Sequence, residues 1–200
     1  MKQALPKTAI IGRVFHVAIS ALIVTFALIA LCSLTACDGK THAAQKSLEE
    51  TLVALQNQNV AVAGDFLDAV YFDPTLFSVG MDTFVAAYFS EFTYEIKSSS
   101  VNSDGSATIE VSLTSKNMAE VLDDLRSATE TAAISANGAL TSQSADEAFI
   151  GIYSLHSWEI HENTFTILMA QDDEGVWNIV DKGAFGAILL DGYDPRQIMS

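Results

Sequence analysis

The stretch that decides the fold is Thr93–Ser115, TYEIKSSSVNSDGSATIEVSLTS. Alternate residues are apolar over 107–113 and, more briefly, over 93–98. Between these two segments, residues 102–105 (NSDG) have the composition of a tight turn. The stretch therefore predicts an antiparallel β-hairpin with one buried face and one solvent-exposed face.

A second hairpin is predicted near the end of the chain. Residues 165–169 alternate in the same way, the acidic turn DDEG follows at 172–175, and Trp177 and Ile179 belong to the returning strand. The apolar segment 183–192, GAFGAILLDG, is predicted to form a short helix or an edge strand.

Apolar residues at helical spacing precede the first hairpin. Ser47 and Glu50 form a capping-box pair that predicts the start of the first helix. A second helix is expected over 62–70, before the break at Asp73-Pro74, and a third over 81–92.

Two more helices are predicted between the hairpins, as an inserted pair over residues 117–157. Asn117 with Glu120 predicts the cap of the first, and Ser144 with Glu147 that of the second. Helices followed by antiparallel hairpins predict an α+β fold, with the N-terminal helices packed on a curved antiparallel sheet.

Three segments carry a resemblance to a known family: TYEIKSSSV (93–101), DGSATIEVSLTS (104–115) and TILMAQDDEGVWNIVDKG (166–183). They resemble the NTF2-like, or cystatin-like, superfamily and, more narrowly, the uncharacterised lipoprotein domains of that type in bacteria. The resemblance covers about residues 47–190 and implies one cone-shaped domain over residues 47–200. The inserted helix pair departs from the simplest version of that fold.

The N-terminus has the parts of an export signal. A basic segment, residues 1–16, precedes the uncharged apolar segment 17–36, and Leu34-Thr35-Ala36-Cys37 resembles a bacterial lipobox. The resemblance implies a signal peptide over residues 1–36, cleavage before Cys37, and diacylglycerol and palmitate-type acylation of that cysteine. Residues 37–46 would then be the lipidated cysteine and a polar tether.

The apolar segment is also long enough to remain as an uncleaved membrane anchor, since about 20 apolar residues span a bilayer. In both cases the positive charge lies before the apolar segment, so the chain after it is expected on the extracytoplasmic face of the cell membrane.

Charge and composition exclude several classes of function. The 200 residues include 10 Lys and Arg against 25 Asp and Glu, a net charge of -15. Because residues 1–36 carry +3, the remainder carries -15 - 3 = -18. Such a surface repels phosphate backbones, so we expect no nucleic-acid partner. Both cysteines, Cys32 and Cys37, precede the folded part, which excludes a disulfide scaffold there.

Metal-binding patterns are weak. His156 and His161 are spaced as H-x4-H, with Glu159 and Glu162 nearby, which does not reproduce a helical zinc-protease motif. The acidic runs at 123–124 and 172–174 lack the ligand spacing of a calcium loop. We therefore expect no metal site and no cofactor.

The family resemblance implies one catalytic possibility, because NTF2-like enzymes hold an acid–base pair inside the apolar cone. Weak pocket candidates are Tyr88, Tyr94, Tyr153 and His156, all on faces that also have the pattern of core. The sequence contains no nucleophile elbow and no glycine-rich phosphate loop.

We therefore expect a membrane-anchored lipoprotein that acts as a non-enzymatic binding or interaction module. Its partner would be another envelope protein or a small apolar ligand, and a homodimer formed through the sheets is a further option. The alternative is an extracytoplasmic enzyme, of the isomerase or dehydratase kind, that uses the interior of the cone.

Overall fold

The computed structural model describes residues 39–135 and 142–193. The chain divides into two compact units, residues 1–42 and 43–200. Only residues 39–42 of the first unit are described, and they are helical. The expected signal peptide and the lipidation site at Cys37 lie outside the described residues.

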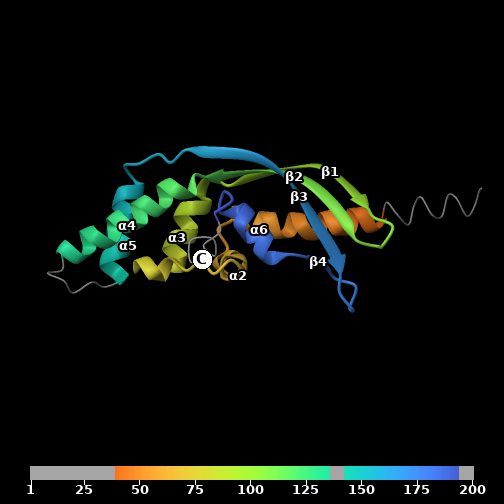
Figure 1. The fold of residues 1–200 in the computed structure, drawn as a ribbon, viewed down its shortest axis with the longest axis horizontal. Helices are drawn as coiled ribbons and strands as arrows, with labels where there is room; N and C mark the ends of the chain where they lie inside the picture. Colours follow the sequence, from red (N-terminus) through yellow and green to blue (C-terminus); the bar gives the residue numbers. More distant parts are fainter. Residues whose placement is uncertain (1–38, 136–141, 194–200) are drawn as a thin grey trace, which may run out of the picture. The chain divides into compact units, whose positions relative to one another are not determined.

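A four-stranded antiparallel sheet organises the second unit, with the strand order β1-β2-β3-β4 (Figure 1). The strands are β1 (Thr93–Val101), β2 (Ala107–Lys116), β3 (Ile160–Gln171) and β4 (Trp177–Ile179). The two predicted hairpins are confirmed as β1–β2 and β3–β4. Their turns hold Gly105 and Gly175 at φ 89° and φ 80°, a backbone conformation that favours glycine.

One face of the sheet is buried, as the alternation predicts. The inward residues of β2 are at most 2 % exposed, and they are Ala107, Ile109, Val111 and Leu113. Figure 1 shows the helical segment 43–56 and α6 (Lys182–Leu189) along this face. The observed architecture confirms the predicted α+β class.

The other helices lie where the hydrophobic periodicity predicted them, although some begin or end at different residues. They are α2 (Val60–Ala69), η1 (Pro74–Phe77), α3 (Met81–Tyr88), η2 (Phe89–Glu91), α4 (Met118–Ser135) and α5 (Ser142–Tyr153). The predicted helix over 81–92 is thus divided into α3 and the 3-10 turn η2. The α4–α5 pair lies between β2 and β3 in the chain, where the inserted pair was expected.

The polar tether expected before Ser47 differs from what the structure shows. Residues 43–46, which belong to the second unit, are helical, and this helix continues to residue 56. Ala44 is fully buried and begins an apolar stripe with Leu48, Leu52 and Leu55. Because burial starts before Ser47, this residue lies inside the helix, and its hydroxyl donates to the Trp177 carbonyl at 2.8 Å.

Two other predicted caps are partly wrong. The Asn117 side chain does accept the Ala119 N–H at 3.0 Å, but the Glu120 carboxylate accepts the Glu159 N–H at 2.8 Å instead of closing a capping box. Helix α5 begins at Ser142, so Ser144 lies in its first turn. The segment 183–192, left open as helix or strand, forms α6, with Asp181 accepting the Ala184 N–H at its start.

Aromatic side chains fill the interior between the helices and the sheet. Phe84, Phe89 and Phe185 are at most 1 % exposed. Phe84 stacks on Tyr88 with ring centroids 5.3 Å apart, and Phe66 meets Phe185 edge-to-face at 4.9 Å. Two cavities lined by residues of this part of the chain are described below.

Among the described residues, no helix has the length and apolar character needed to cross a membrane. The apolar segment 17–36 lies outside that part of the chain.

Candidate functional site

A polar cleft of about 450 Å³ lies beside the end of β2. Its walls come from η2, from Lys116 at the end of β2, and from the segment 153–158 that ends α5 and follows it. These segments are distant in sequence, so the fold alone brings them together.

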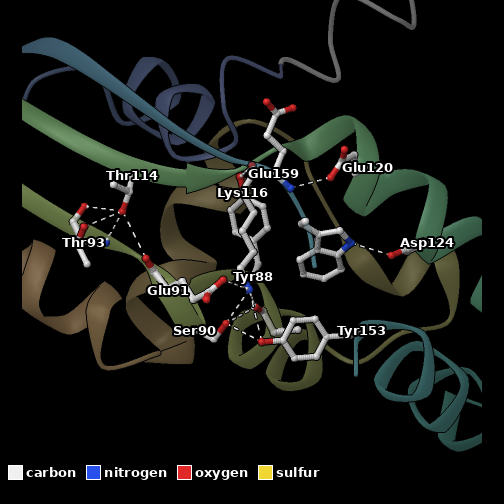
Figure 2. Close-up of polar contacts among 12 residues, drawn as sticks. Tyr88, Ser90, Glu91, Thr93, Thr114, Lys116, Glu120, Asp124, Tyr153 and Glu159 are labelled. Carbon is white, nitrogen blue, oxygen red and sulfur yellow. Dashed lines mark hydrogen bonds and ion pairs between the residues drawn. The ribbon is translucent and has the colours of Figure 1, made fainter. Parts of the chain in front are cut away.

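Lys116 is the central residue of this cleft. Its side chain is only 3 % exposed, although it carries an ammonium group. The Nζ atom donates to the Ala87 carbonyl at 2.9 Å and to the Ser90 hydroxyl at 2.7 Å. The Tyr153 hydroxyl is farther away, at 3.4 Å, and a Glu91 carboxylate oxygen lies at 3.5 Å. Figure 2 shows the Ser90, Glu91 and Tyr153 side chains around Lys116 Nζ.

Two aromatic rings also contact the ammonium group. Nζ lies 4.7 Å from the ring centroid of Tyr153 and 4.9 Å from that of Trp158. At these distances the ring faces attract the cation, and they offset part of the cost of removing it from water.

The backbone around Lys116 is firmly held. The buried Tyr88 hydroxyl lies 3.1 Å from the Lys116 carbonyl oxygen and 3.0 Å from that of Leu189. The next residue, Asn117, donates its N–H to the Glu159 carbonyl at 2.8 Å. The Trp158 indole donates to the Asp124 carboxylate at 2.7 Å, which fixes the wall of the cleft.

The cleft contains two of the four pocket candidates, Tyr153 and His156. The Tyr153 and Ser90 hydroxyl oxygens are 2.7 Å apart, and His156 Nδ1 lies 2.8 Å from an Asp124 carboxylate oxygen. Tyr153 and His156 therefore belong to one surface.

The other two candidates lie elsewhere. Tyr88 is part of the core at 2 % exposure, and burial, together with the charge of Asp191, raises its pKa well above the ordinary value. Tyr94 is a half-buried residue of β1 whose pKa is raised by burial and by Glu49. The structure does not bring these tyrosines into the cleft.

The two histidines of the HSWEIHE segment (156–162) have different carboxylate partners. His161 Nδ1 lies 2.7 Å from Asp191, whereas His156 contacts Asp124. The hydrogen bond to Asp191, supported by Glu159, raises the pKa of His161. Within residues 39–135 and 142–193, no three His, Cys, Asp or Glu side chains are grouped closely enough to hold a metal ion.

A second cavity, of about 590 Å³, is larger and mainly apolar. It lies between the helical segment 43–56, α2 and the β3–β4 hairpin, and its apolar walls include Ala54, Val62, Phe66, Met169, Trp177 and Ile179. The lining also includes Glu50, Asp65 and Lys182, and the last two form an ion pair.

Trp177 has an unusual environment in this second cavity. The residue is 5 % exposed, and its indole Nε1 is buried without a hydrogen-bond partner among the described residues. Buried indole N–H groups normally find an acceptor, because an unmet donor costs free energy.

Sequence reasoning missed Lys116, Ser90 and the whole apolar cavity. Lys116 follows a run of alternating residues and has the spacing of the solvent-exposed side of β2, so nothing in the pattern indicated its burial. The apolar cavity combines residues from 47–66 with residues from 169–182, which only the folded chain brings together.

Comparison of the chain with protein-family models, with curated proteins and with solved structures found no match.

Proposed function

We propose that this chain is a lipid-anchored, extracytoplasmic binding module whose NTF2-like domain takes up a small apolar ligand in the cavity lined by Trp177. The observation that carries the proposal is the cavity itself. Its volume, about 590 Å³, lies within the range typical of small-molecule sites, and its walls are mainly apolar.

The lining indicates the kind of ligand. Burial of apolar surface contributes ~25 cal/mol per Å², so a ligand that buries ~200 Å² gains about 5 kcal/mol before the cost of association. The apolar side chains in the lining therefore favour a small, mostly hydrocarbon molecule.

The location and the family rest on sequence features. Leu34–Cys37 supports the lipid anchor, and the basic segment before residues 17–36 supports the extracytoplasmic side. The order of helices and hairpins supports an NTF2-like domain. The isomerase-like alternative needs an open interior, and the burial of Phe84, Phe89 and Phe185 among the core side chains does not favour it.

Native mass spectrometry of the full chain, released from mild detergent after addition of octanol, tests the cavity. We expect the wild-type protein to retain octanol, or a ligand from the cell, as a mass that denaturation removes. Ala54→Phe places a ring in the cavity, so it should abolish this extra mass.

The matched control is Ala86→Phe, an exposed alanine on α3 that does not line the cavity. This variant should retain the ligand as the wild type does. Equal retention by the Ala54 variant, or no retention by the wild-type chain at saturating octanol, would contradict the proposal.

A further inference from the structure

The Lys116 ammonium group is buried, and one of its three hydrogen bonds is long. An ammonium group has three N–H donors. Two of them have short contacts, to the Ala87 carbonyl at 2.9 Å and to the Ser90 hydroxyl at 2.7 Å. The third hydrogen bond, to the Tyr153 hydroxyl, is long at 3.4 Å, and a Glu91 carboxylate oxygen lies 3.5 Å from Nζ. The third donor is therefore satisfied less well than the other two, and it lies beside an open cleft.

Glu91 is the only carboxylate within salt-bridge distance of Nζ among the described residues. Its side chain is 59 % exposed, and it belongs to the short surface turn η2. Exposed carboxylates at such distances contribute little to an ion pair and can move away easily. Glu91 is thus a weak counter-ion for a cation that is almost completely buried.

We propose that the cleft is an anion site, in which the carboxylate of a small monocarboxylate binds Lys116 and displaces Glu91. One ligand oxygen would accept the third N–H of Nζ as a charge-assisted hydrogen bond. The other would accept from the Tyr153 or Ser90 hydroxyl, which lie side by side in the cleft (Figure 2).

The surroundings favour a singly charged ligand over a phosphate. Lys116 is the only Lys or Arg among the described residues that line the cleft, and the chain as a whole carries a net charge of -15. A doubly charged anion would meet stronger repulsion from that surface and would find no second cation in the lining. The rim also offers Leu155, which is 91 % exposed, to an apolar group on the ligand.

Benzoate is a suitable probe, because its ring is small beside a cleft of about 450 Å³. Binding to the full chain in detergent is measured by ligand-observed NMR at low ionic strength, with benzamide as the neutral isostere. We expect benzoate to bind more tightly than benzamide. We also expect Glu91→Gln to raise the affinity for benzoate about three- to five-fold, because the competing carboxylate is gone.

The matched control is Glu174→Gln, which removes the same charge from the exposed β3–β4 turn. This control should leave the affinity within two-fold of the wild-type value. Lys116→Met should reduce it at least ten-fold. If that variant does not fold, the comparison of the two glutamine variants decides, since neither glutamate is buried.

Three results would overturn the inference: no benzoate binding by the wild type or by E91Q, equal binding of benzamide, or equal effects of the two glutamine variants. The anion site does not depend on the apolar cavity. Ala54→Phe should therefore leave benzoate binding unchanged, so that the failure of one proposal is distinguishable from the failure of the other.

Discussion

At the scale of single residues, His161 is the clearest link between structure and pH. Its Nδ1 lies 2.7 Å from Asp191 and its Nε2 lies 3.4 Å from Glu159. The hydrogen bond to Asp191 is the main cause of its raised pKa. A pKa that is higher in the folded state means that the protonated histidine stabilises the fold.

This contribution has a definite pH range. It is fully present below the unfolded-state pKa of about 6.5 and is lost as the pH rises through the higher folded-state pKa. Asp191→Asn removes the charged acceptor, and asparagine tolerates the left-handed backbone at this position, φ 56°. We expect the stability difference between wild type and D191N to be largest near pH 5.5 and to shrink by pH 8.5.

Urea denaturation at several pH values measures this difference. Asp173→Asn, at an exposed turn position, is the control and should keep the wild-type pH profile. A constant difference between wild type and D191N across the range would show that the histidine's titration is not the cause.

Residue-level contacts of this kind could not be predicted from the sequence. The pattern placed His161 near the start of a strand, but its partner Asp191 is 30 positions away, and Lys116 meets Ser90 across 26 positions. Side-chain pairs at such separations depend on how the helices lie against the sheet, which no local pattern encodes.

At the scale of elements, the packing of α6 on α2 depends on Gly186. A Cβ atom at this position would lie 2.4 Å from the Phe66 carbonyl oxygen and 2.9 Å from a Val70 methyl group. The two helices therefore approach more closely than any larger residue permits. The nearby ring contact between Phe66 and Phe185 belongs to the same interface.

Gly186→Ala should lower the free energy of unfolding by about 2 kcal/mol, because overpacked positions typically cost 1–3 kcal/mol. The control is Gly64→Ala on α2, where a Cβ would meet nothing within 4 Å. That variant should gain about 0.5–1 kcal/mol, as alanine is the better helix former. Urea titrations of both variants check the prediction, and equal stability of the two would contradict the close approach.

The elements in which apolar residues recur with a regular period were the ones predicted correctly from the sequence. The alternation in residues 107–113 gave the correct buried face of β2, and the apolar spacing near Phe66 and Phe84 gave α2 and α3. Helix starts were less predictable, because Ser47 and Glu120 have acceptors and donors in other elements. The short apolar segment 183–192 has no decisive period, and the Asp181 cap accompanies its helical form.

At the scale of the whole molecule, the charge distribution divides the chain. Residues 1–36 carry +3 and the remainder carries -18, with the boundary at the lipobox-like segment. Composition could not predict the two cavities, since these depend on the relative positions of helices and hairpins.

Lipidation of Cys37, proposed above as the membrane anchor, can be tested on the whole molecule. Cys37→Ala should abolish incorporation of an alkyne-labelled palmitate in an expressing bacterium, and the chain should keep the mass of residues 1–36. Cys32→Ala, within the apolar segment, should label and mature as the wild type does. Persistent labelling of C37A, or its loss in C32A, would contradict lipidation at Cys37, and absence of label in all three chains would favour an uncleaved anchor.

The irregular register of β1 has a consequence for a chain anchored to a membrane in the way proposed above. β1 is an edge strand of the described sheet, and its pairing with β2 shifts between Ile96 and Ser98, at Lys97. Bulges and lysines on edge strands oppose pairing with the edge of another molecule. If copies are confined to two dimensions by their acyl chains, collisions between edges become frequent. The irregular pairing at Lys97 would then allow the protein to reach a high surface density without forming intermolecular sheets.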